Sequence, residues 1–250
     1  MAALLLVPVQ QVRPGGLRAP KTPEALPARV QRIVLHTLGG PFYRDPARRW
    51  TFLPPRETFA LWRRPRFGAH WIVWTDGSLW PRHPREGEPA SVRPPVDAPA
   101  GAVWRTRLAR EASPVYVHAS GANADTLGIE VAHSGRSDDP FPDAQARSVA
   151  WLLRALLDMS GGRLRTGAVV GHKDLDDRPA YADESCDHDG CAYYADDTGR
   201  PFRRRVDPPE GLFAALRRVG LVIPRPVAEG DDELRRAEAV PRDRVPAMHR

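Results

Sequence analysis

The chain has little cysteine and almost no lysine. Among its 250 residues there are two cysteines, Cys186 and Cys191, and the only lysines are Lys21 and Lys173. Two cysteines can form a local disulfide, remain as free thiols or take part in a metal site. His188 between them suggests a metal, but four clear ligands are missing. We therefore favour a disulfide or free thiols and exclude a zinc finger.

Because lysine is scarce, arginine carries almost all of the positive charge, and the formal net charge is +6. An arginine excess suits an anionic partner such as nucleic acid, an acidic cell-wall polymer or a membrane surface. The sequence has no basic helix and no finger-type Cys/His spacing, so we expect no nucleic-acid partner. Genomic bias toward arginine codons explains the excess more simply than a dedicated anion-binding surface does.

The sequence also lacks a long apolar run. No stretch approaches the ~18–20 apolar residues that a membrane-spanning helix needs, so we expect no transmembrane segment. Residues 1–8 are apolar, but no charge precedes them and no clear small-residue cleavage site follows. We interpret them as a strand or arm and not as a secretion signal, which leaves a cytoplasmic location or export by a non-classical route.

Proline, in contrast, is abundant, at 27 residues in a chain that is 42% hydrophobic. The hydrophobic content supports one sizeable core, and the prolines indicate long irregular connections. We expect a monomer with an irregular N-terminal arm at 1–29 and one domain at 30–223, which carries an insertion at 175–204. The charges and prolines of residues 224–250 predict a disordered tail.

Apolar periodicity and turn residues predict the regular elements. Strands are expected at residues 31–36, 67–74, 78–80, 126–133 and 169–170, and helices at 55–63, 103–111, 143–159 and 209–219. Asp76-Gly77 predicts a hairpin turn. Residues 41–55 and the insertion show no period and are expected to be irregular. The mixture predicts an α/β fold, with a central mixed β-sheet flanked by helices.

Three side chains stand out for their chemistry. His36 and His172 each end a short apolar run, and Asp207 lies two residues after Arg205 and just before two prolines. Two histidines at strand ends and a carboxylate fit an open zinc site, in which three protein ligands leave the fourth position to water. The residues alone leave other interpretations open. His36 can be satisfied by backbone groups, and Asp207 can cap a helix.

Several motifs occur in the order found in one enzyme family. They are Ile33-Val-Leu-His36, Gly68-Ala-His70-Trp-Ile-Val-Trp-Thr-Asp-Gly77, Val117-His118-Ala-Ser-Gly121 with Asn123 and Leu127-Gly-Ile-Glu130, Val170-Gly-His172-Lys-Asp174, and Arg205-Val-Asp207-Pro208. Over residues 30–219 the chain thus resembles the zinc-dependent N-acetylmuramoyl-L-alanine amidases related to peptidoglycan-recognition proteins.

The resemblance implies hydrolysis of the amide between N-acetylmuramic acid and L-alanine, in peptidoglycan or in muropeptide fragments. It implies a Zn²⁺ cofactor and assigns the site residues as follows: His36, His172 and Asp207 as metal ligands, Glu130 as general base, Arg205 as oxyanion stabiliser, and His118 and Asn123 as substrate-binding groups. His70 and His133 are expected to be structural or to orient a ligand.

Two departures from the family leave alternatives open. The second and third ligands are 35 positions apart (207 minus 172), because the insertion lies between them. Cys186 or Asp187 of the insertion could therefore be the third ligand in place of Asp207. We favour Asp207, because the basic residue before it and the prolines after it match the family. Loss of one ligand would instead give a non-catalytic peptidoglycan-binding module of the same fold.

Overall fold

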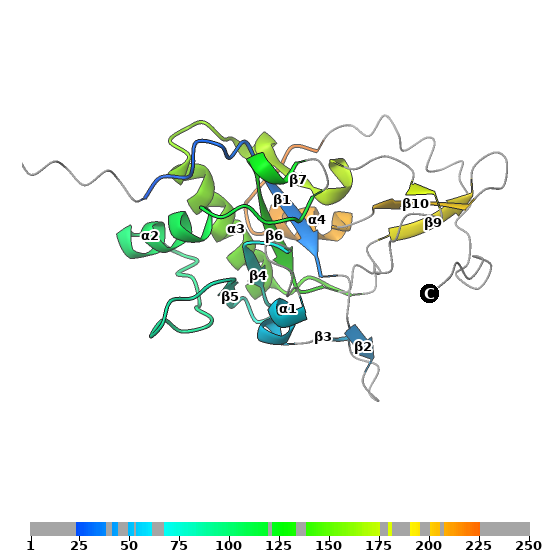
Figure 1. Cartoon of the computed structure of the whole chain (residues 1–250), viewed down its shortest axis with the longest axis horizontal. Helices are drawn as coiled ribbons and strands as arrows, with labels where there is room; N and C mark the ends of the chain where they lie inside the picture. Colours follow the sequence, from blue (N-terminus) through cyan, green and yellow to red (C-terminus); the bar gives the residue numbers. More distant parts are fainter. Residues whose placement is uncertain are drawn as a thin grey trace, which may run out of the picture.

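The structure, a computed structural model (Figure 1), describes residues 24–38, 54–60, 68–119, 122–133, 139–175 and 208–225 with their side chains. It also describes the backbone of Leu61 and of five short strands. These are β2 (Phe42–Arg44), β3 (Trp50–Phe52), β8 (Ala180–Tyr181), β9 (Cys191–Ala195) and β10 (Pro201–Arg205).

The centre of the fold is a five-stranded mixed sheet with the strand order β5-β4-β6-β1-β7. Its strands are β1 (Arg32–Thr37), β4 (Trp71–Val73), β5 (Leu79–Pro81), β6 (Thr126–Val131) and β7 (Val169–Gly171). β1 pairs in parallel with β6 and β7, β4 pairs in parallel with β6, and β5 runs antiparallel to β4. This arrangement confirms the predicted mixed α/β fold.

Four α-helices accompany the described part of the sheet: α1 (Pro55–Leu61), α2 (Ala102–Glu111), α3 (Asp143–Met159) and α4 (Glu210–Arg218). Three short 3-10 helices, η1 (Asn123–Asp125), η2 (Thr166–Ala168) and η3 (His172–Asp174), lie in the connections. The four predicted helices are therefore confirmed, with ends that differ by one or two residues. No helix among the described residues has the length and apolar character needed to cross a bilayer.

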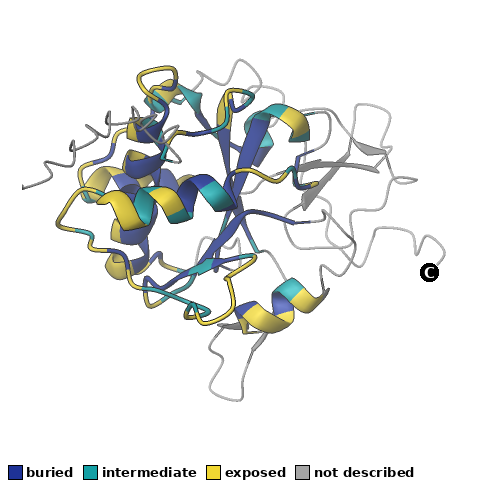
Figure 2. Cartoon of the chain, turned by 60° about the vertical axis from the view of Figure 1, so that its left-hand side comes forward, coloured by how far each residue is buried: buried dark blue, intermediate teal, exposed yellow. Residues whose placement is uncertain are grey.

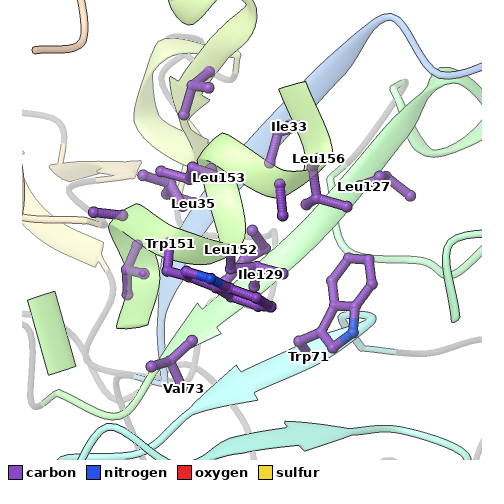
Figure 3. Packing of buried hydrophobic residues seen from close by; sticks show 14 of the residues in the cluster. Ile33, Leu35, Trp71, Val73, Leu127, Ile129, Trp151, Leu152, Leu153 and Leu156 are labelled. Atoms are coloured by element: carbon purple, nitrogen blue, oxygen red, sulfur yellow. The ribbon is translucent and has the colours of Figure 1, made fainter. Parts of the chain in front are cut away.

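The main core lies between α3 and one face of the sheet. Ile33, Leu35, Leu127 and Ile129 of the two central strands pack with leucines of α3, as Figure 3 shows. Burial of one such side chain stabilises the fold by about 1.5–3 kcal/mol. Successive strand residues face opposite sides of a sheet, so the same alternation turns His36 and Glu130 to the face away from α3.

The central strands are buried on both faces (Figure 2). This is usual for parallel strands and explains why their sequences are nearly continuous apolar runs. α3 is amphipathic, so its apolar stripe was visible in the sequence. Its C-terminal end is followed by Gly161 and Gly162, both with positive φ, as expected for a helix stop.

Two expectations of irregular structure are wrong. Within residues 41–55, β2 and β3 pair as an antiparallel ribbon. Within the insertion, β8, β10 and β9 form a separate three-stranded antiparallel sheet, in which β10 pairs residue by residue with β9. The three strands of the insertion lack an alternating apolar pattern, and Pro201–Arg205 carries three consecutive arginines. A search for period two therefore cannot find them.

The predicted hairpin turn allows a stability test, because Gly77 at its tip has φ +82° and lies against α3. A Cβ at this position would be 2.7 Å from the Ala144 carbonyl oxygen and 2.9 Å from Ser148 Oγ. We expect Gly77→Ala to lower the free energy of unfolding by about 1–2 kcal/mol through backbone strain and by a further ~1–3 kcal/mol through overpacking.

Gly87→Ala is the matched control for this substitution. Gly87 has φ +79°, but a Cβ at this position would have no atom within 4 Å, so only the backbone cost applies. Urea unfolding of both variants measures the difference. Equal losses would show that the hairpin tip does not pack tightly on α3.

Candidate metal centre

His36 and His172 lie together at the carboxyl ends of two neighbouring parallel strands. His36 is the fifth residue of β1, and His172 directly follows β7. Their Nδ1 atoms are 3.0 Å apart, and both side chains are buried. The structure therefore brings together two predicted ligands that are 136 positions apart in the sequence.

The turn that presents His172 is held by Asp174. Asp174 Oδ2 accepts the backbone N–H of Gly171 at 2.6 Å, and the Leu175 N–H donates to the His172 carbonyl at 3.0 Å. Arg225 binds both carboxylate oxygens of Asp174 and stacks 3.9 Å above the Phe213 ring. A carboxylate held by a backbone donor and a bidentate guanidinium is strongly fixed, so the His172 turn is rigidly placed.

Gly171 lets the chain after the insertion approach this turn. A Cβ at position 171 would lie 2.9 Å from Pro208 Cδ, so only glycine permits the contact. On the other side of the undescribed residues 206–207, β10 ends at Arg205 and contacts η3, which contains His172. The described residues on both sides of Asp207 therefore lie near His172.

The His118 ring is the next neighbour of His36. Its Nδ1 is 3.2 Å from His36 Nε2, and its Nε2 is 3.1 Å from Thr126 Oγ1. Burial, with the charge of His36 as the next cause, lowers the pKa of His118 to about 2. His118 is therefore a neutral imidazole with a polar neighbour at each ring nitrogen.

Asn123 organises the loop that carries His118. Its Oδ1 accepts the backbone N–H groups of His118 at 2.7 Å and of Ala119 at 2.8 Å. The side chain thus has a clear structural task next to the site. Its predicted contact with substrate remains a prediction, as does that of His118.

His70 ties the same loop to strand β6. Its Nδ1 accepts the Gly128 N–H at 3.0 Å, so its Nε2–H can donate to the Pro114 carbonyl at 3.1 Å. Burial lowers the pKa of His70 to about 3, which keeps the ring neutral. The other histidine expected to be structural, His133, stacks on Phe141 with a ring-centroid distance of 3.7 Å.

Glu130 lies on β6, the central strand of the sheet, next to the strand that carries His36. It is in register with His36 across the parallel β1–β6 pair, so the two side chains leave the same face of the sheet. Glu130 is half-buried. Its side chain therefore leaves the sheet next to His36, on the face opposite the α3 core.

The remaining predicted site residues lie partly or wholly outside the described residues. The backbone of Arg205 ends β10, where it pairs with Cys191, and nothing is described of its side chain. Asp207, Cys186 and Asp187 are not among the described residues. Thr126, Asp174 and Arg225 also support the site, and none of the three was predicted to do so. Only Asp174 belonged to a recognised motif, and no local pattern marks the other two.

The donor set fits a zinc ion as far as it is described. Zinc binds imidazole nitrogen at about 2.0–2.1 Å, so two nitrogen ligands of a tetrahedral site are roughly 3.3 Å apart. The His36–His172 distance of 3.0 Å is close to this value. Within the described part of the chain, no group of three or more His, Cys, Asp and Glu side chains could hold a metal. Asp207, the predicted third ligand, lies outside the described residues.

Two histidines and a carboxylate are a donor set that can hold a catalytic zinc ion, and such an ion can activate water for hydrolysis. Sequence comparison identifies the family. A family profile described as N-acetylmuramoyl-L-alanine amidase matches residues 26–189, which is more than half of the chain, and the chain belongs to this family. The match includes His36, His172 and Glu130 but ends before Arg205 and Asp207. A search of curated proteins finds no match.

Solved structures of amidases resemble the chain weakly. LysCS, an endolysin amidase from Clostridium intestinale URNW, has 16% identity and a TM-score of 0.36, covering 62% of this chain and 74% of LysCS. AmiD from E. coli, in complex with anhydro-N-acetylmuramic acid-L-Ala-D-gamma-Glu-L-Lys, has 17% identity and a TM-score of 0.37, covering 60% of this chain and 51% of AmiD. AmpDh3 from Pseudomonas aeruginosa, in complex with anhydromuramic pentapeptide, has 16% identity and a TM-score of 0.36, covering 96% of this chain and 83% of AmpDh3. Likenesses at this level carry no weight for the function.

Proposed function

We propose that the protein is a zinc-dependent amidase that hydrolyses the bond between the lactyl group of N-acetylmuramic acid and the L-alanine of the stem peptide. The observation that carries the proposal is the buried His36–His172 pair, with Nδ1 atoms 3.0 Å apart, beside the in-register carboxylate of Glu130. The substrate class follows from membership of the amidase family.

The proposed metal ligands are His36, His172 and Asp207. Support for Asp207 comes from its chain neighbours. Pro208, which directly follows Asp207 in the sequence, lies against Gly171, and β10 contacts η3 from the other side. Cys186 and Asp187 of the insertion remain the alternative third ligands.

Each chemical step needs a group that moves or stabilises charge. A bound zinc ion would lower the pKa of its water to about 7 and polarise the scissile carbonyl. Glu130 would accept the proton of the attacking water and return it to the leaving amine nitrogen, which balances the hydrolysis. Arg205 would donate hydrogen bonds to the developing oxyanion. The products are a muramic-acid carboxylate and a peptide with a free amino terminus.

Chelation tests the proposal directly. Protein treated with a chelator and freed of metal is expected to lose amidase activity on purified muropeptides and to regain it when Zn²⁺ is added. Mass spectrometry of the released stem peptide measures the cleaved bond. Parallel assays on intact sacculi would show whether polymer or soluble fragment is the better substrate.

Two results would contradict this function. Full activity in the presence of chelator would remove the metal from the mechanism. Zinc-loaded protein that binds muropeptide without releasing peptide would identify a non-catalytic binding module instead.

A further inference from the structure

We propose that Thr126 and His118 act as positioning residues that hold His36 in the tautomer needed for metal binding. The inference rests on the proposed zinc site, but its evidence is a chain of hydrogen bonds in this structure. The chain runs from the Ala122 carbonyl through Thr126 and His118 to His36. It differs from the substrate contact that the sequence predicted for His118.

The direction of the first hydrogen bond follows from donor chemistry. Thr126 Oγ1 lies 2.6 Å from the Ala122 carbonyl oxygen and 3.1 Å from His118 Nε2. A hydroxyl has one proton and a carbonyl oxygen can only accept. The Thr126 hydroxyl therefore donates its hydrogen bond to the Ala122 carbonyl, and its oxygen accepts a hydrogen bond from His118 Nε2–H.

This direction sets the tautomers of two imidazoles. A neutral imidazole with its proton on Nε2 has an acceptor at Nδ1. His118 Nδ1 therefore accepts from His36 Nε2–H across 3.2 Å, and His36 in turn has its lone pair on Nδ1. That atom faces His172 Nδ1 at 3.0 Å, where the zinc ligands are proposed.

The packing around His118 preserves this geometry. A Cβ at position 128 would lie 2.7 Å from His118 Cγ and 2.8 Å from its Nδ1, so glycine makes room for the ring against β6. Thr126 is fully buried, which excludes water as a competing partner for its hydroxyl. Asn123 fixes the loop backbone on the other side.

Both ring nitrogens of His118 are used in these contacts, so in this proposal His118 acts through His36 and not through a hydrogen bond to substrate. Metal-binding histidines commonly donate their second ring N–H to a fixed acceptor, and loss of that acceptor weakens metal binding by about 10–100-fold. Here the acceptor is another imidazole, whose own orientation depends on a threonine.

The test compares Thr126→Val with Thr126→Ser. Valine removes the hydroxyl at nearly constant volume, whereas serine keeps it. We expect Thr126→Val to weaken zinc affinity about 10-fold, measured by competition with a chromophoric chelator, and Thr126→Ser to stay near wild type. Long-range ¹H–¹⁵N NMR of the metal-free protein should show the Nε2–H tautomer of His36 in wild type and Thr126→Ser and a mixture of tautomers in Thr126→Val.

A double-mutant cycle tests whether Thr126 acts on His36 through the His118 ring or only by packing. The hydrogen bonds from Thr126 through His118 to His36 are called the relay here. In His118→Asn the amide oxygen can accept from His36 without help from Thr126. Adding Thr126→Val to His118→Asn should therefore cause no further loss of zinc affinity. An additive loss, or equal losses in Thr126→Val and Thr126→Ser, would show that Thr126 acts only through packing and would overturn the proposal.

The NMR readout keeps this inference separate from the proposed function. If wild-type protein takes up no zinc, the proposed function fails, and the His36 tautomer in metal-free protein still decides the relay. If wild type binds zinc and Thr126→Val changes neither the affinity nor the tautomer, the relay fails and the zinc site stands.

Discussion

Replacing His172 with alanine is expected to abolish zinc binding and amidase turnover together. The substitution leaves the Nδ1 of His36 without its neighbour at 3.0 Å and removes one of the three proposed ligands. With too few ligands the ion is not retained. Zinc content by elemental analysis and turnover on muropeptides should both fall to background.

His83→Ala is the matched control, because His83 is exposed and lies outside the histidine pair. It should retain zinc and activity.

Cys186→Ser and Asp207→Ala test the identity of the third ligand. Cys186→Ser should keep full zinc content, whereas Asp207→Ala should lose zinc. Loss of zinc from Cys186→Ser, with zinc retained by Asp207→Ala, would show that a residue of the insertion is the third ligand.

Glu130→Gln is expected to keep zinc but to lower kcat by about 10²–10⁴-fold. The amide has the shape of the carboxylate, so the register with His36 and the fold are preserved. It cannot accept the proton of the attacking water. Because the loss concerns proton transfer, KM should change little.

Glu88→Gln serves as the control for this substitution. Glu88 accepts hydrogen bonds from Arg110 of α2 through both carboxylate oxygens, and both side chains are half-buried, so the substitution should lower stability and leave activity unchanged. Wild-type turnover of Glu130→Gln would rule out Glu130 as the base. Loss of zinc in that variant would instead make Glu130 a part of the metal site.

The sequence predicted those parts of the fold whose pattern is local. The apolar runs that end at His36 and His172 marked two strands, and because both are parallel strands of one sheet their ends meet at the same edge. α3 was visible from its apolar stripe and the glycines that follow it. In each case burial imposes a periodic pattern on consecutive residues.

Features that depend on long-range pairing could not be predicted in the same way. The sheet formed by β8, β9 and β10 is held by backbone pairing, and its arginine-rich strand has no apolar alternation. The orientation of His118 depends on Thr126, Gly128 and His36, which only the folded chain brings into contact. Sequence motifs indicated that His118 belongs to the site but could not show which groups its ring nitrogens meet.

The Arg225–Asp174 pair makes the segment after α4 part of the support for the metal centre. Arg225 lies 51 positions beyond Asp174 in the sequence, yet it grips the carboxylate that closes the His172 turn. The residues that support the candidate site therefore extend past α4. Truncation, proteolysis or fusion close to Arg225 would loosen the turn that carries His172, a proposed metal ligand.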